Sequence, residues 1–519
     1  MWLLAIQLYS LRSQRNWGIG DFGDLARLIA AAAARGAAGI GLNPLHALFL
    51  DRPDQASPYA PNSRLFLNPL YIAVDAIPEF PEAMPADIAE VVSALRDSEF
   101  VDYAVVARAK LTVLGLAYAR FRENASVARR ADFDAFRHEQ GETLLRFATF
   151  ECLRHHYGPT PWREWPAPWR APTVAQLAGF RARHLDDCEF HEFMQWVAHR
   201  QLAGCRDEAR RLGMPIGLYT DLAVGIDPDG ADAWSRQDAV LCDVVIGAPP
   251  DAFNPAGQNW GLAPFNPHGL ADDDFRPLRA LLRAAMRFSG ALRIDHVLAL
   301  KRLFLIPRGG SAADGAYVRL PFEAMLRVVA EESQRNGCIV IGEDLGTVPE
   351  GFRETLAQWG LWSYRVLLFE REPDGRFRPP DAYPEAALVT FNTHDLPSFQ
   401  GWMTGHDLRV KRAIGVDPGE SDGDRAAARA AMRALLLEQA GGEDFAAVAA
   451  TLARTPARLA TVALDDVLGV ADQVNIPSTV HEHPNWRRKL PLPLEDLDRD
   501  GRLDAVSRVF AEAGRAATA

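Results

Sequence analysis

The sequence is poor in cysteine and lacks the features of a disulfide-bonded, zinc-bound or membrane-spanning protein. Its 519 residues include five cysteines, and no two of them are spaced as CxxC. An odd number without that spacing argues against a disulfide framework and a structural zinc site, and favours a reducing compartment. No apolar run reaches the roughly 20 residues of a membrane helix, and the start of the chain shows no signal-peptide pattern. We therefore expect a cytoplasmic protein without a membrane partner.

Positive charge is also in deficit. Lys and Arg number 56 against 68 Asp and Glu, which gives a net charge of −12. No run of five like charges forms a basic patch, so nucleic acid and anionic membranes are not expected as partners. Hydrophobic residues make up 48% of the chain, a fraction typical of a folded globular protein. The acidic balance is compatible with a neutral substrate.

What the sequence does contain is a recurring pattern of an amphipathic helix, a glycine and a short apolar run. Residues 22–35 show it first, with Asp21 as a candidate N-cap and Gly36 as a candidate stop. The same pattern predicts helices over residues 193–212, 274–289, 322–336 and 350–359. Short apolar runs without alternation are typical of strands buried on both faces. Eight such runs lie near residues 3–8, 38–43, 215–220, 291–295, 339–343, 364–369, 387–392 and 472–476.

Eight buried strands separated by helices favour an α/β fold of the (β/α)8 type, the TIM barrel. The weaker alternative is an open doubly wound sheet, which would usually carry a phosphate-binding loop, and the sequence has no P-loop. We expect a single catalytic barrel domain over residues 1–519. The uneven spacing of the runs predicts a mainly helical subdomain inserted at 73–190, between strands two and three, and a further helical insertion at 400–470.

Acidic residues follow several of the predicted strands. In a (β/α)8 barrel the carboxyl ends of all strands meet at one mouth, where the chemistry takes place. A lone acid there is often a loop cap or an ion-pair partner, but several converging acids repel one another and indicate a functional site. The acids at these predicted strand ends are Asp221, Asp295, Glu343, Asp344 and Asp395, and His394 precedes the last of them.

Two carboxyl groups that flank a sugar acetal are the usual apparatus of glycoside chemistry. One of them must be ionised to attack, and the other must be protonated to donate. Arg293 lies two residues before Asp295, so both side chains should share one face of a strand. A guanidinium in that position favours the ionised carboxylate, which suits a nucleophile. A purely structural Arg–Asp pair would show the same spacing.

Segments along nearly the whole chain make the sequence resemble the 4-α-glucanotransferases (amylomaltase, or disproportionating enzyme) of glycoside hydrolase family 77. The order of LRIDH, GED and THD is highly specific for that family. The matching segments are NWGIGDFGDL at 16–25, GLNPLHALF at 41–49, SPYAPNSRLFLNPLYI at 57–72, DLAVGIDPDGADAW at 221–234, GAPPDAFNPAGQNWG at 247–261, LRIDH at 292–296, IGEDLGTVP at 341–349, YRVLLFE at 364–370, NTHDLP at 392–397 and QVNIPSTVHEHPNWRRKLP at 473–491.

The resemblance implies a role for each matching residue. Asp295 would be the nucleophile, Glu343 the general acid/base, and Asp395 would bind sugar hydroxyls and stabilise the transition state. The implied substrate-binding residues are Tyr59, Asp221, Gln258, Trp260, Arg293 and His394.

The resemblance also implies the reaction. The enzyme would be a retaining 4-α-glucanotransferase that moves segments of maltooligosaccharides or α-1,4-glucans to the 4-hydroxyl of an acceptor glucan or of glucose. The alternative is an α-1,4-glucan hydrolase that uses the same carboxylates, because the first half-reaction is shared. A catalytically silent glucan-binding protein fits less well, since all three acids are present. No metal or organic cofactor is expected, and the HxH pair of His481 and His483 has no further ligand cluster nearby in the sequence.

Overall fold

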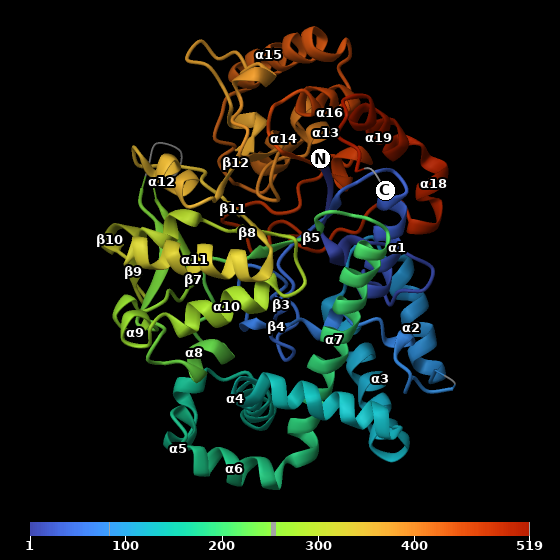
Figure 1. Ribbon diagram of the computed structural model, residues 1–519, viewed down its shortest axis with the longest axis vertical. Coiled ribbons are helices and arrows are strands. Elements are labelled where there is room, and N and C mark those ends of the chain that lie inside the picture. The colour runs from blue at the N-terminus through green and yellow to red at the C-terminus, as the bar shows by residue number, and fades with distance from the viewer. Residues whose placement is uncertain (83, 251–255, 518–519) are drawn as a thin grey trace.

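Eight parallel strands close into a barrel (Figure 1). The computed structural model describes residues 1–82, 84–250 and 256–517. Around the barrel the strands follow the order β1-β14-β13-β12-β11-β8-β5-β2, so that successive barrel strands are neighbours in space. This arrangement confirms the predicted (β/α)8 fold. The barrel strands are β1 (Trp2–Ile6), β2 (Gly39–Leu42), β5 (Gly217–Leu222), β8 (Ala291–Ile294), β11 (Ile339–Gly342), β12 (Trp362–Val366), β13 (Ala387–Thr390) and β14 (Leu459–Ala463).

The last barrel strand is not the one that the sequence predicted. Seven of the eight predicted runs coincide with barrel strands, but residues 472–476 form a loop, and β14 closes the barrel between β13 and β1. The sequence of β14, LATVA, lies near an alanine-rich stretch that suits a helix equally well. Its pairing with both neighbours, in which Ala460 lies opposite Trp2 and Val389, decides its conformation. The strand falls within the segment 400–470, for which the sequence indicated only helix.

The first predicted helix begins and ends near its predicted caps, whereas the helix predicted over 193–212 begins eight residues earlier, at Leu185. In α1 (Phe22–Ala33) the carboxylate of Asp21 accepts two backbone N–H groups in a capping box. Gly36 follows with a φ of 73°, a left-handed conformation that other residues rarely adopt. Gly290 is required for a different reason, because a Cβ there would lie 2.2 Å from the carbonyl oxygen of Ile216. The other helices predicted from this pattern are α7 (Leu185–Arg211), α10 (Arg276–Met286), α11 (Phe322–Asn336) and α12 (Phe352–Gln358).

A largely helical segment connects β2 to β5, and most of it forms the lower part of the molecule in Figure 1. The long helix α7 packs against both α4 and α1 and so joins this segment to the barrel. Rings of Phe121, Phe133 and Trp196, with centroids 5.2–5.4 Å apart, fill the space between α3, α4 and α7. The subdomain limits at 73–190 stay a prediction, and residue 83 lies outside the described residues. The elements are β3 (His46–Ala47), β4 (Ser63–Leu67), α2 (Ala86–Asp97), α3 (Tyr103–Asn124), α4 (Val127–Tyr157), α5 (Ala167–Arg170) and α6 (Val174–Arg183).

A second sheet, which the sequence did not predict, is built from two barrel loops. Its strands are antiparallel in the order β10-β9-β6-β7; β6 and β7 come from the loop after β5, and β9 and β10 from the loop after β8. Residues 251–255, within the motif at 247–261, lie outside the described residues. The elements of these loops are α8 (Ala231–Ser235), β6 (Val244–Ala248), β7 (Gln258–Leu262), α9 (Pro267–Asp272), β9 (Arg302–Pro307) and β10 (Ala316–Arg319).

The remaining helices surround the C-terminal barrel strands. Trp2 of β1 stacks on Phe510 of α19 with ring centroids 5.1 Å apart, which fastens the C-terminal helix to the first strand. Within the described part of the chain, no helix combines the length and the apolar character needed to cross a membrane. These helices are α13 (Phe399–Thr404), α14 (His406–Ala413), α15 (Asp422–Ala440), α16 (Phe445–Ala453), α17 (Leu464–Val467), α18 (Leu497–Asp500) and α19 (Arg502–Glu512).

Candidate active site

Two carboxylates leave neighbouring barrel strands at the same level. Asp295 directly follows β8 and Glu343 directly follows β11, and the last residues of these strands, Ile294 and Gly342, are paired in register. The backbone N–H of Glu343 extends the ladder by donating to the carbonyl of Ile294 at 3.0 Å. Because neighbouring strands lie about 4.8 Å apart, the two acids stand close together at the carboxyl end of the barrel.

Arg293 lies between Asp295 and a third acid, Asp221 of β5. Its Nη1 donates to both carboxylate oxygens of Asp221 at 2.7 Å, and its Nη2 donates to Oδ1 of Asp295 at 2.9 Å. Arg293 is 7% exposed and Asp221 is 8% exposed. Burial would lower the pKa of Arg293, but the surrounding anions raise it well above its usual value. The guanidinium is therefore charged, and it fixes the position of Asp295.

Asp295 has the ionisation that a nucleophile needs near neutral pH. Burial raises its pKa to about 6, although Arg293 acts in the opposite direction. The nearby acids Asp221 and Glu343 raise the pKa as well. A carboxyl group with this pKa is largely ionised at pH 7, and burial leaves its oxygens poorly solvated. Such a carboxylate is suited to attack an electrophilic carbon.

Glu343 accepts one backbone hydrogen bond on each carboxylate oxygen. The N–H of His296 lies 2.9 Å from Oε2, and the N–H of Leu345 lies 3.0 Å from Oε1. His296 adopts a left-handed φ of 46°, which is part of the turn that brings its N–H to the acid. Burial raises the pKa of Glu343, against the effects of Arg293 and of the two N–H groups. A raised pKa lets this carboxyl group hold a proton closer to neutral pH, as an acid catalyst must.

The adjacent acid, Asp344, has a structural role. It is fully buried and accepts hydrogen bonds from Arg353 at 2.6 Å, from the hydroxyl of Ser363 at 2.9 Å and from the backbone of Tyr364 at 3.3 Å. These partners lie on α12 and β12, so Asp344 ties both elements to the end of β11. Since side chains alternate along an extended chain, Glu343 is left to face the site.

Asp395 lies in the loop after β13 and is held by two side chains. The amide of Asn475 donates to its Oδ1 at 2.6 Å, and Nε2 of His394 lies 3.4 Å from its Oδ2. Burial alone would raise the pKa of Asp395, but His394 and Asn475 leave it below its usual value. Burial likewise opposes the charge on His394, yet Asp395 leaves the pKa of the histidine raised. Asp395 is therefore a stable carboxylate.

Aromatic rings form one side of the site. Tyr59 stacks on His394 with ring centroids 4.4 Å apart, and Trp486 lies 5.5 Å from Tyr59 and 5.2 Å from His394. The hydroxyl of Tyr59 donates to Asp221 at 2.6 Å and lies 3.1 Å from Nδ1 of His394. Tyr59 thereby links the acid of β5 to the loop after β13 in one hydrogen-bonded network.

Gln258 and Trp260 reach the other side of the site from β7. The indole N–H of Trp260 donates to Oε1 of Gln258 at 2.8 Å, and the Trp260 ring meets His296 edge-on with centroids 5.2 Å apart. The backbone N–H of His296 donates to Glu343, so His296 bridges Trp260 and that acid. Contacts thus connect all the predicted site residues in two groups, which meet at the adjoining ends of β8 and β11.

Several contributors were missing from the predicted set of site residues. Asn475 and Trp486 lie in the segment 473–491, and the resemblance of that segment to the family was the only signal for them. The N–H groups of His296 and Leu345 act through the backbone, so residue type gives no signal for them. In the same segment, Nε2 of His483 lies 2.9 Å from the carbonyl oxygen of Gln473, so this histidine is engaged with the loop itself.

Comparisons with known proteins agree with this geometry. A family model described as 4-alpha-glucanotransferase matches residues 6–494. A 4-alpha-glucanotransferase of Mycobacterium tuberculosis is 40% identical over 554 aligned positions, which cover 100% of this chain and 75% of the relative. One of Haemophilus influenzae is 37% identical and is matched over 95% of this chain and 76% of its own length.

Solved structures give the same result for the fold. Amylomaltase from Corynebacterium glutamicum matches with a TM-score of 0.87 and 33% identity, over 98% of this chain and 75% of that one. Amylomaltase from Streptococcus agalactiae, solved in complex with acarbose, matches with a TM-score of 0.81 and 21% identity over 99% of both chains. At that identity the second likeness concerns the fold alone.

Proposed function

Because the chain belongs to the 4-alpha-glucanotransferase family, we propose that its barrel mouth transfers α-1,4-glucan segments by a retaining, double-displacement mechanism. The observation that carries the assignment of residues is the register of β8 and β11, which sets Asp295 beside Glu343. Retention requires the two carboxyl groups to approach to about 5–5.5 Å. Adjacent strands spaced about 4.8 Å apart support such an approach.

In the first step Asp295 acts as the nucleophile. Its carboxylate oxygen attacks the anomeric carbon of the donor glucan while the bond from that carbon to the glycosidic oxygen breaks. Glu343 gives its proton to the departing oxygen, so the leaving glucan carries a free 4-hydroxyl. The products of this step are a glycosyl ester on Asp295 and an ionised Glu343.

In the second step Glu343 acts as a base. It removes the proton from the 4-hydroxyl of an acceptor, and the resulting oxygen attacks the anomeric carbon and displaces Asp295. Two inversions at the same carbon restore the α configuration. The acceptors that we propose are maltooligosaccharides, longer α-1,4-glucans and glucose. Side chains handle every proton and electron pair in both steps, so the proposal needs no cofactor.

The other side chains position the sugar. Asp395, whose pKa lies below its usual value, remains ionised and can accept hydrogen bonds from sugar hydroxyls. Tyr59 is partly exposed beside His394, and a ring of this kind can pack against the apolar face of a pyranose. Trp486 is buried and packs against Tyr59. We propose that Gln258 and Trp260 contact the glucan on the Glu343 side, because Trp260 packs on His296.

Incubation of the purified protein with maltotriose tests the proposal. Transfer yields maltotetraose and longer products together with shorter ones, which chromatography resolves. Glucose and maltose alone would identify an α-1,4-glucan hydrolase that uses the same carboxylates with water as the acceptor. Binding of maltotriose without any product would contradict both reactions.

We also propose that the enzyme works in the cytoplasm. All five cysteines are free thiols, and four of them are buried. Free thiols are the ordinary state of cysteine in a reducing compartment. We expect protein prepared from a reducing compartment to show the same activity with and without a reducing agent.

A further inference from the structure

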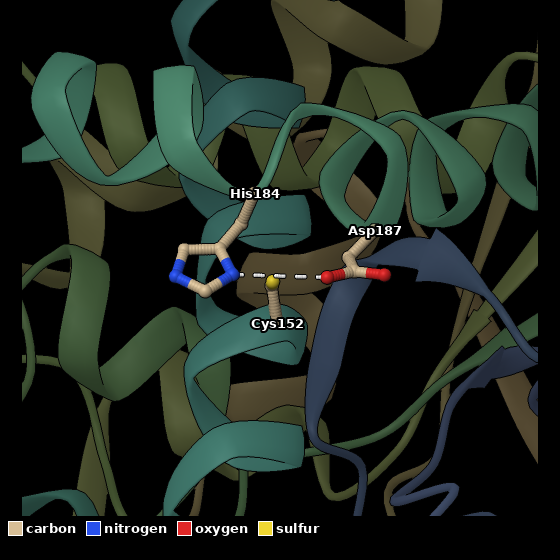
Figure 2. Close-up of side chains that lie close together, drawn as sticks. All are labelled: Cys152, His184 and Asp187. Atoms are coloured by element: carbon tan, nitrogen blue, oxygen red, sulfur yellow. Dashed lines mark ion pairs between the residues drawn. The ribbon is translucent and has the colours of Figure 1, made fainter.

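Three potential metal ligands converge on one point in the helical segment between β2 and β5. Cys152 comes from the last turns of α4, His184 joins α6 to α7, and Asp187 lies in the first turn of α7. One ligand atom from each, namely Sγ, a ring nitrogen and a carboxylate oxygen, lies within 4.8 Å of the other two. Figure 2 shows the thiol beside the line that joins the histidine to the aspartate. Among the described residues, no other group of His, Cys, Asp and Glu is brought together in this way.

The spacing of these atoms suits a tetrahedral ion. Zinc binds sulfur at about 2.3 Å and nitrogen or oxygen at about 2.0–2.2 Å, so its ligand atoms lie roughly 3.5 Å from one another. Nδ1 of His184 is 3.7 Å from Oδ2 of Asp187. Closing the three atoms onto an ion therefore needs only small side-chain rotations. Thiolate and imidazole ligands favour zinc over magnesium and calcium, which prefer oxygen.

A simple ion pair between His184 and Asp187 does not account for the thiol. Cys152 is 3% exposed, whereas the side chain of Asp187 is 64% exposed, so the cluster has a buried sulfur end and an open carboxylate end. The thiol of Cys188 lies beside that of Cys152. An ion that enters from the open end would bond to the Cys152 sulfur as a thiolate, and the thiol proton would pass to solvent.

Arg181 and His156 also lie near the cluster. Arg181 is the nearby positive charge that acts on both thiols, and its Nη2 already pairs with Glu192 at 2.5 Å. His156 packs edge-on against His184, with ring centroids 5.9 Å apart. Asp187 contributes the negative charge that faces solvent.

We propose that Cys152, His184 and Asp187 bind one zinc ion, with water in the fourth position, and that this ion clips α4 to the corner between α6 and α7. The clip would close the part of the chain that contains α5 and α6. Crosslinks that close long segments restrict the unfolded chain most. The site is structural, because every proposed catalytic acid comes from the carboxyl ends of barrel strands. Figure 1 places α4, α5 and α6 together at the lower end of the molecule.

Cobalt is the probe that tests the ligands, because a cobalt–thiolate bond gives a charge-transfer band that other ligands do not. The full-length protein, kept reduced and freed of metal by dialysis, is titrated with Co²⁺ and then with Zn²⁺. We expect one equivalent of cobalt, a thiolate band that zinc removes, and a rise in melting temperature with zinc. Cys152→Ser should abolish the band. Asp187→Asn, at a position where the side chain is 64% exposed, should weaken zinc binding by about tenfold or more.

Matched variants separate this site from other thiols and histidines. Cys338→Ser removes a buried thiol next to β11, and His138→Ala removes an exposed histidine from α4 itself. Both variants should keep the band and the zinc-dependent melting shift. A band that survives Cys152→Ser would overturn the proposal. So would zinc binding that His138→Ala weakens as much as Asp187→Asn does. A thiol count that is two short in the protein as purified would also overturn it, because Cys152 would then form a disulfide with Cys188.

Discussion

The guanidinium of Arg293 holds the carboxylate of Asp221 through a single nitrogen, Nη1, which lies 2.7 Å from both of its oxygens. The second nitrogen, Nη2, is thereby free to donate to Asp295 at 2.9 Å. One buried cation thus serves two acids with different tasks. Asp221 fixes the arginine, and the arginine fixes the proposed nucleophile and favours its ionised form.

The first prediction concerns pH. Attack requires ionised Asp295, whose pKa burial raises to about 6, so kcat/KM should fall as the pH drops through about 6. Protonated Glu343 is also required, so kcat/KM should fall again at higher pH. The two pKa values of this bell-shaped profile belong to Asp295 and Glu343 as a coupled pair. Arg293 lowers the pKa of Asp295, so Arg293→Gln should move the acidic limb to higher pH, while Arg293→Lys should move it less. An acidic limb unchanged in Arg293→Gln would contradict this account.

The second prediction separates two acids by their consequences. Asp295→Asn should lower kcat by about 10³-fold or more, since the nucleophile is lost, with little change in melting temperature. Asp344→Asn should instead lower stability by about 1–3 kcal/mol, because it disturbs a fully buried carboxylate with three donors. Turnover of maltotriose and thermal unfolding measure the two effects. Near-native turnover in Asp295→Asn would exclude the assignment.

The third prediction uses the double role of Glu343. Glu343→Gln should cripple transfer from ordinary glucans, because the leaving oxygen receives no proton. A donor with a very acidic leaving group should still react and leave its glucosyl group on Asp295, where mass spectrometry would detect it. Azide needs no deprotonation, so it should restore turnover and give an α-glucosyl azide. Equal loss with both donors and no azide rescue would remove Glu343 from the acid/base role.

The fourth prediction concerns Asn475, which donates to Asp395 at 2.6 Å and helps to lower the pKa of that acid. A hydrogen bond to a charged group is worth about 1.5–3 kcal/mol. Asn475→Ala should therefore lower kcat/KM by roughly 10–100-fold. Asn475→Asp keeps the size but places a second negative charge beside Asp395, so it should be more damaging than Asn475→Ala. The reverse order of the two variants would argue against a positioning role.

The fifth prediction concerns stability away from the site. Burial raises the pKa of Asp466 in α17 to about 7, well above the usual value for aspartate. A raised pKa means that the folded state binds the proton more tightly, so this contribution to stability is present at low pH and is lost as the pH rises through about 7. Asp466→Asn keeps an oxygen for the N–H of Phe399 and should stabilise the protein at pH 8 by an amount on the order of 2 kcal/mol. At pH 4, near the usual pKa of aspartate, the difference from the native protein should largely disappear.

Local sequence patterns are sufficient for most of the barrel. The helix over 322–336 is predicted with its observed limits, and Asp21 caps α1 as expected. Strand β14 was not predicted because its five residues, LATVA, mix leucine and alanine, which suit a helix, with threonine and valine, which suit a strand. Only its two neighbours in the barrel decide between them. The sheet of β6, β7, β9 and β10 was not predicted for a similar reason, because its strands pair across two loops from different parts of the chain.

The residues that end most of the barrel strands follow from the sequence alone, because the pattern of apolar runs is a local property. Together with the resemblance to the family, it is enough to mark Asp295, Glu343 and Asp395 as candidates. The surroundings of the three acids depend instead on the tertiary fold: Asn475 reaches Asp395 from a distant loop, and Asp344 turns away to Arg353. The fold also brings Cys152 to His184, although the cysteine spacing argues against a zinc site. Contacts between distant segments depend on how helices and strands pack, and no local pattern records them.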